Sequence, residues 1–202
     1  MAIFSLKNKE VLSNLTAPAN IDLGAMIPIA TVTVGSGGSS SITFSDIPQN
    51  YEHLQIRLML RDGRNYGRND IYMQVGNSTI DTGTNYSWHR LYGDGSSSAS
   101  NAGSTQSYMS FATLCANTAP ANTFGVAIVD ILNYADTNKY KTIRALAGGD
   151  NNNTAEPPYI SLDSGLWRST SAINQIKIYD ETSSNFLQYS HFALYGIKRA
   201  GA

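Results

Sequence analysis

The 202-residue sequence has little of what several functional classes require. It contains one cysteine, Cys115, which excludes an intrachain disulfide framework and a zinc site built from several thiolates. Charged residues make up only 14 % of the chain, against about 25 % in ordinary soluble domains. The 14 basic residues are balanced by 15 acidic ones, so the positive surface that a nucleic-acid-binding protein needs is missing. We therefore expect no nucleic acid among the partners.

Long apolar segments are also missing. No run approaches the roughly 20 residues of a membrane span, and residues 1–10 lack the apolar core of a signal peptide. We therefore expect a soluble protein without a membrane partner, synthesised in a cytoplasm. The apolar share of 42 % excludes a disordered chain, and the length suits one domain whose core needs neither disulfides nor metal.

Helical periodicity is nearly absent, and an alternation of period two replaces it. The clearest case is residues 53–61, where four apolar residues fall on one side: Leu54, Ile56, Leu58 and Leu60. Because successive side chains of a strand point to opposite faces, this pattern predicts a strand with one buried and one solvated face.

Similar segments recur along the chain between turns rich in Gly, Asn and Ser. The expected strands cover residues 29–34, 41–44, 71–75, 86–92, 108–115, 124–134, 141–147, 173–179 and 187–198. The glycine-rich residues 35–38 predict a hairpin between the first two, and the nearly continuous apolar character of 124–134 is typical of a central strand covered on both faces. About ten short strands without intervening helices predict an all-β fold, an antiparallel, jelly-roll-like β-sandwich.

Two kinds of segment lie outside this pattern. Residues 1–27 have no sustained alternation, and we expect them to form an extended N-terminal attachment arm, followed by the sandwich domain at 28–202. The candidate contacts of the arm are its scattered apolar residues: Ile3, Phe4, Leu6, Leu12 and Leu15. Residues 96–107 and 148–158 are of low complexity, and we expect them to be loops.

Catalytic patterns are weak. Each histidine lies on or beside an expected strand, and no nucleophile elbow accompanies any of them: His53, His89 and His191. Two acidic pairs are candidates for a glycosidase pair, although Asp is more often a turn former: Asp62 with Asp70, and Asp81 with Asp94. We therefore predict no catalytic residue, no metal and no cofactor.

The loop that follows residues 53–61 is rich in arginine. Arg61, Arg64 and Arg68 alternate with Asp62 and Asp70. Because arginine is favoured in protein interfaces, these residues are candidates for ion pairs between subunits.

An aromatic triplet, Tyr86, Trp88 and Tyr92, shares one face of an expected strand. Such a face can be core, a protein interface or a platform on which a sugar ring stacks. We favour core or interface and keep glycan binding as the alternative.

Two stretches carry a resemblance. Residues 44–57, FSDIPQNYEHLQIR, resemble a segment of small β-rich virion proteins of tailed bacteriophages, in which it introduces a long core strand. Residues 192–198, FALYGIK, are similar to the closing strand of the same group. Together they cover about a tenth of the chain and carry over no catalytic residue. The group includes capsid decoration proteins, fibres and tail components.

The resemblance implies a non-enzymatic structural role on the virion surface, after synthesis in the host bacterial cytoplasm. We expect a capsid cement (decoration) protein that binds other virion proteins as a homo-oligomer, with a trimer favoured by the resemblance alone. The alternative is a short tail or head fibre, or a knob, with lectin-like binding of a host glycan. A polysaccharide-degrading enzyme is a third class, which would require two convergent carboxylates in a cleft.

Overall fold

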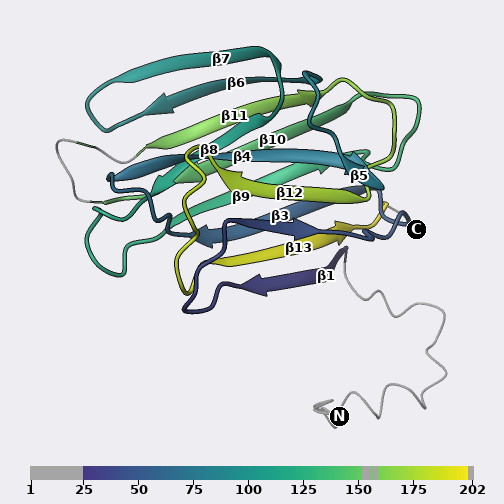
Figure 1. Ribbon diagram of the computed structural model, residues 1–202. Coiled ribbons are helices and arrows are strands. Elements are labelled where there is room, and N and C mark those ends of the chain that lie inside the picture. The colour runs from purple at the N-terminus through teal and green to yellow at the C-terminus, as the bar shows by residue number, and fades with distance from the viewer. Residues whose placement is uncertain (1–24, 152–155, 157–158, 200–202) are drawn as a thin grey trace, which may run out of the picture.

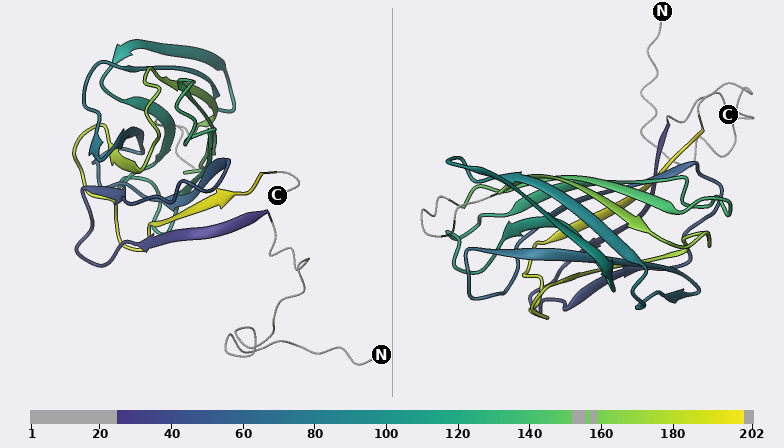
Figure 2. Two further views of the ribbon diagram at one scale, coloured as in Figure 1. Left: turned by 90° about the vertical axis from the view of Figure 1, so that its right-hand side faces the viewer. Right: turned by 90° about the horizontal axis from the view of Figure 1, so that it is seen from above.

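The computed structural model describes residues 25–151, 156 and 159–199. In these ranges the chain forms thirteen strands in two antiparallel sheets, which confirms the predicted β-sandwich (Figure 1). This number exceeds the eight strands of a simple jelly roll. Seen end-on, the larger sheet curves around the smaller one (Figure 2, left). The described part contains no α-helix and hence no helix suited to crossing a membrane.

The larger sheet has eight strands. In spatial order they are β1 (Met26–Thr33), β13 (His191–Ile197), β3 (His53–Leu60), β9 (Gly125–Leu132), β10 (Lys141–Gly148), β11 (Ile160–Trp167), β6 (Tyr86–Gly93) and β7 (Ser98–Gln106). The smaller sheet has five: β2 (Ser41–Phe44), β12 (Gln175–Asp180), β4 (Arg68–Asn77), β5 (Thr79–Ile80) and β8 (Met109–Cys115), the last two both paired with β4.

The core lies between the two sheets. Strand β3 follows its sequence pattern, because Leu54, Ile56 and Leu60 are fully buried on its inner face. Tyr86 and Phe111 approach from β6 and β8 and are buried as well. Each such apolar side chain contributes roughly 1.5–3 kcal/mol through burial, so this face holds the two layers together.

The predicted hairpin between residues 29–34 and 41–44 is wrong. A turn does form, with Gly38 at φ +70° and its N–H donating to the carbonyl of Gly35 at 3.1 Å. However, β1 pairs with β13 and β2 pairs with β12, in different sheets. The glycines permit the turn, but burial of the two apolar faces on different layers decides the pairing.

Two further strands differ from the prediction. Residues 96–107, expected to be a loop, contain β7, which pairs with β6 at the edge of the larger sheet. Strand β11 was not expected, because Asp163 and Gly165 interrupt its apolar pattern, and it pairs with both β10 and β6. In both cases backbone pairing with a neighbour compensates for side chains of low strand propensity.

The two stretches that carry the resemblance are neighbours in space. Residues 44–57 enter β3, residues 192–198 form most of β13, and Ile56 is opposite Leu194 in the antiparallel pair. Strand β1 then continues the sheet from Met26, two residues before the predicted start of the sandwich domain. The five candidate arm contacts lie outside the described residues: Ile3, Phe4, Leu6, Leu12 and Leu15.

Candidate functional site

The outer face of β9 and β10 is apolar, although no second layer covers it in the described chain. Val126 and Ile128 of β9 and Leu146 of β10 are exposed there. We expected residues 124–134 to be covered on both faces, and for the described residues this expectation is wrong, because exposed and buried residues alternate along β9. The smaller sheet packs on the inner face of β9 only. In the described chain the outer face of β9 therefore stays exposed, although its composition is that of a strand buried on both faces.

These apolar side chains form two rows across neighbouring strands. One row joins Ile128, Leu146, Leu162 and Leu91 by register. The second joins Met59, Val126 and Ile160, with Gly148 between the last two. Directly opposed residues have Cβ atoms about 4.5–5.5 Å apart, so the first row is continuous, and the second is interrupted at Gly148. We call the seven side chains the apolar outer face; they are 41–66 % exposed: Met59, Leu91, Val126, Ile128, Leu146, Ile160 and Leu162.

A shallow hollow of about 230 Å³ lies within the apolar outer face. Val126, Ile128, Leu146 and Ile160 line it around Gly148. The missing side chain of Gly148 interrupts the second row and leaves room for an apolar side chain of a partner. The hollow offers almost no hydrogen-bonding groups, so it suits apolar packing against a partner.

A polar row borders the apolar outer face. Gln55, Asp130 and Arg144 are opposite one another on β3, β9 and β10. The side-chain amide of Gln55 donates to Asp130 at 2.9 Å, and Arg144 pairs with the same carboxylate at 2.8 Å. Although partial burial opposes it, hydrogen bonding to Arg144 and Gln55 lowers the pKa of Asp130. The border is therefore charged and fixed, as in the rim of a protein interface.

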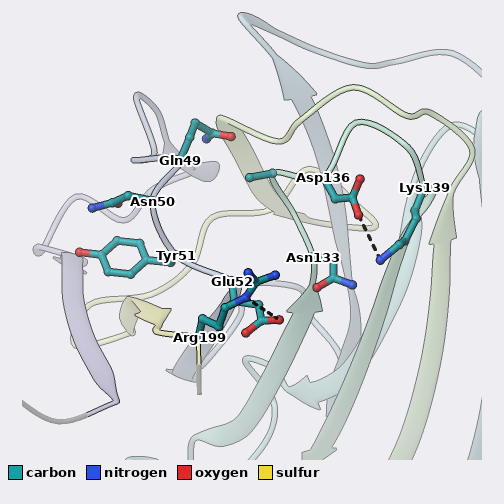
Figure 3. A pocket seen from close by; sticks show the side chains of 9 residues that line it. Gln49, Asn50, Tyr51, Glu52, Asn133, Asp136, Lys139 and Arg199 are labelled. Carbon is teal, nitrogen blue, oxygen red and sulfur yellow. Dashed lines mark ion pairs between the residues drawn. The ribbon is translucent and has the colours of Figure 1, made fainter. Parts of the chain in front are cut away.

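A separate pocket of about 470 Å³ opens at the end of the sandwich where β3 begins and β9 ends (Figure 3). Its side chains include two ion pairs, Glu52 with Arg199 at 3.9 Å and Asp136 with Lys139 at 3.0 Å. Each carboxylate thus faces its own basic partner, and hydrogen bonding to residue 138 and to Lys139 lowers the pKa of Asp136. The pocket lies beside the start of β1, where the amide of Lys198 donates to the carbonyl of Ala25 at 2.9 Å.

The aromatic triplet is divided between core and surface. Tyr86 is fully buried, and its hydroxyl bonds to the backbone of Val75 and Asp81. Trp88 is 8 % exposed in the core. Neither presents a face to a sugar, so the core interpretation holds for both, whereas Tyr92 is half-buried and lines a polar pocket.

Arg61 and Asp62 are buried and make their contacts within the chain. The guanidinium of Arg61 donates to four backbone carbonyls of residues 117–123, including that of Ala119 at 2.6 Å. Asp62 accepts from the amide of Arg64 and from Asn69, each at 2.8 Å. For these two the candidate role in intersubunit pairs is wrong, because burial takes them away from any partner surface.

The other three residues of that set surround one polar pocket. Arg64 pairs with Glu181 at 3.1 Å, and Asp70 pairs with Arg90 at 3.0 Å. Arg68 lies over the ring of Tyr159. Their partners here belong to the same chain and lie between 20 and 117 positions away, which the sequence pattern did not indicate. The role of these three residues in pairs between subunits stays a prediction.

The histidines and the second acidic pair have structural contacts. His53 accepts from the amide of Asn133, and His191 contacts Thr33, both at 3.0 Å. His89 is exposed on the outer face of β6. The pair forms no common site, because each carboxylate makes hydrogen bonds within or beside its own turn: Asp81 with Gly83, Asn85 and Trp167; Asp94 with Ser96 and Ser97.

Among the described residues no group of three or more His, Cys, Asp or Glu side chains is placed to hold a metal ion. Sequence reasoning missed the half of the apolar outer face that β6 and β11 supply. A signal existed in β6, where Leu91 falls on the side opposite Trp88.

Comparison of the chain with protein-family models, with curated proteins and with solved structures found no match.

Proposed function

We propose that this protein is a non-enzymatic structural component of a tailed-phage virion, a capsid cement protein that binds the assembled coat through its apolar outer face. The observation that carries the proposal is the pair of apolar rows on a sheet face that no described segment of the chain covers. The location on a virion rests on the resemblance of residues 44–57 and 192–198. The trimer remains part of the proposal, on the same ground.

The size of the apolar outer face fits a specific contact. Seven large side chains, each about half exposed, form a patch at the upper end of the roughly 300–600 Å² found on typical monomers. Removing about 600 Å² from water contributes a gross stabilisation of about 15 kcal/mol. Association itself costs on the order of 4–15 kcal/mol. The face therefore supports attachment of modest affinity, which the polar row of Gln55, Asp130 and Arg144 and the attachment arm would strengthen.

Such a protein stabilises a particle by linkage. A partner that binds only the assembled coat lowers the free energy of that state and leaves free subunits unaffected. Stabilisation of this kind requires no chemical step. The few charges and the many Ser, Thr and Asn side chains suit such a role in adhesion.

The proposal is tested by co-sedimentation with particles of the same phage that lack this protein. Leu146→Lys places a charge in the centre of the apolar outer face, and we expect binding to fall at least about tenfold, which corresponds to about 1.4 kcal/mol. The matched control is Thr142→Lys, four residues earlier on the same strand and also exposed, which should bind like the wild type.

Three outcomes would contradict the proposal. Equal binding of Leu146→Lys and Thr142→Lys to particles would show that the apolar outer face takes no part in attachment. Binding to purified tails and not to capsids would favour the alternative, a short fibre. If the wild-type protein binds neither capsids nor tails, the proposed structural role is refuted.

A further inference from the structure

A second pocket, of about 260 Å³, opens between the two sheets at the end opposite the one in Figure 3. The start of β4, the end of β6 and residues from β7 and β8 contribute to it. The residues just before β11 and just after β12, Tyr159 and Glu181, complete its rim. The volume is slightly below the roughly 300–1,000 Å³ of pockets for drug-sized ligands, so the space fits a single small ring.

The buried guanidinium of Arg90 forms part of the lining, and four side chains hold it in place. Its Nε donates to Asp163 at 2.5 Å, and its Nη2 donates to Ser110 at 2.8 Å. Its Nη1 donates to Asp70 at 3.0 Å and to Thr113 at 2.8 Å. Arg90 is only 5 % exposed, so this part of the lining is rigid before any ligand arrives, which lowers the entropic cost of binding.

Asp70 presents an acceptor to the pocket. Both Arg90 and Thr113 donate to its Oδ1. In the part of the chain that the structure describes, no donor reaches its Oδ2, and the side chain is about one-third exposed. This oxygen is available to accept a hydrogen bond from a ligand hydroxyl.

Three tyrosines are among the residues that line the pocket: Tyr66, Tyr92 and Tyr159. The rings of Tyr92 and Tyr159 lie 4.6 Å apart, and the guanidinium of Arg68 lies 4.2 Å from the centre of the Tyr159 ring. Tyr66 is the most exposed of the three tyrosines, and the guanidinium of Arg64 lies over one face of its ring, 5.2 Å from the centre, which leaves the opposite face for a ligand. Tyrosine combines an apolar ring with a polar tip, and this combination suits a ligand with both C–H and O–H groups on one ring.

The pocket lining carries the guanidinium groups of Arg64, Arg68 and Arg90 and the carboxylates of Asp70 and Glu181, and the buried Asp163, which pairs with Arg90, balances the third positive charge. Arg64 is paired with Glu181 at 3.1 Å, and Arg90 is paired with both Asp70 and Asp163. A phosphate or carboxylate ligand would have to compete with carboxylates already in place. A hydroxyl group both donates and accepts, so it can bind the carboxylates and the guanidinium groups of this lining without displacing either.

We propose that this pocket binds one neutral sugar ring, through stacking on Tyr66 and hydrogen bonds to Asp70, Glu181 and Arg64. The pocket opens between the two sheets, whereas the apolar outer face lies on the other side of the larger sheet. The proposal therefore does not depend on attachment to a virion. It also relocates the predicted glycan face, since of the aromatic triplet only Tyr92 reaches the pocket.

The test is saturation-transfer NMR of the full-length protein with free hexoses. Glucose, galactose and mannose are the neutral probes, and glucuronic acid is the charged one. A site for one ring is expected to bind in the millimolar range. We expect at least one neutral hexose to receive saturation and to bind more tightly than glucuronic acid.

Two surface variants and a control locate the binding. Tyr66→Ala removes the stacking ring and Glu181→Gln removes an acceptor charge, and both residues are exposed enough for the fold to survive. Each should weaken hexose binding at least about fivefold. Tyr140→Ala is the matched control, because Tyr140 is an exposed tyrosine outside the pocket, and it should bind like the wild type.

Several results would overturn the proposal: no saturation of any neutral hexose, tighter binding of glucuronic acid, wild-type binding by both pocket variants, or an equal loss in Tyr140→Ala. The Leu146→Lys variant separates this site from the coat contact. It should lose particle binding and keep hexose binding, so each of the two proposals can fail without the other.

Discussion

The ring of Tyr51 occupies the space that a side chain at position 196 would need. A Cβ atom built on Gly196 would lie 2.3 Å from Cδ2 of the Tyr51 ring. Tyr51 precedes β3, and Gly196 of β13 lies opposite Leu54 of β3. The amide of Tyr51 also donates to the hydroxyl of buried Tyr134 at 3.4 Å. Residues 44–57 and 192–198 therefore pack against each other closely because position 196 has no side chain.

Gly196→Ala should destabilise the fold. The added methyl group meets the body of an aromatic ring rather than the end of a flexible chain, and such overpacking costs about 1–3 kcal/mol. The measurement is the free energy of unfolding in denaturant. Gly37→Ala is the control, because a Cβ there meets nothing within 4 Å, and its effect should stay within about 0.5 kcal/mol. Equal midpoints for the two variants would contradict the packing argument.

Asp163→Asn should destabilise the sandwich more strongly. Asp163 and Arg90 are 2 % and 5 % exposed and pair at 2.5 Å, and removing one partner of a buried pair costs about 3–5 kcal/mol. The control is Glu52→Gln, which removes a more exposed ion pair with Arg199 and should cost less than about 1 kcal/mol. Thermal and denaturant unfolding provide the comparison, and a similar small loss in both variants would be evidence against a stabilising buried ion pair between β6 and β11 of the larger sheet.

Asp62 should make stability depend on pH. Burial raises its pKa from 3.8 to about 6, although the amide of Arg64 and Asn69 favour the charged form. The folded state then holds the proton more tightly than the unfolded state, so stability is full below about pH 4 and falls as the pH rises to about 6. The loss is up to about 3 kcal/mol.

Asp62→Asn should remove this loss. Unfolding free energies measured between about pH 4 and pH 7 should fall with rising pH in the wild type and change less in the variant. In the described chain Oδ2 of Asp62 has no hydrogen-bond partner, so the substitution breaks no contact at that atom. Curves of the same slope for both proteins would show that Asp62 is charged when folded.

Deletion of residues 1–20 should separate folding from attachment. The first strand begins at Met26, so the truncated protein should keep its unfolding midpoint. It should no longer co-sediment with particles, because the apolar outer face that remains binds with modest affinity and the deletion removes every candidate arm contact: Ile3, Phe4, Leu6, Leu12 and Leu15. Retention of binding would show that the arm has no part in attachment.

The sequence was informative where a strand has one buried face and one polar face. The pattern of β3 predicted both its strand and its inner residues, and the bounds of β2 were predicted as they are found. The composition of 124–134 suggested coverage on both sides. One side is covered by the smaller sheet, and the other is the apolar outer face, so the misprediction identifies the surface for which we propose a partner.

The sequence was uninformative where distant residues compensate for a locally poor pattern. Asp163 disrupts the apolar pattern of β11, and its partner Arg90 lies 73 positions away. Strand β7 has hardly any apolar side chains and forms because β6 offers a free edge. The polar pocket could not be predicted for the same reason, since Tyr66, Tyr92 and Tyr159 meet only after both sheets have formed.

Attachment to the coat through the apolar outer face can be seen directly in a density map of whole particles that carry this protein. We predict that the larger sheet faces the coat, with Leu91, Leu146 and Leu162 in contact with coat subunits. A map in which these three side chains face solvent, while another surface of the sandwich touches the particle, would contradict the account.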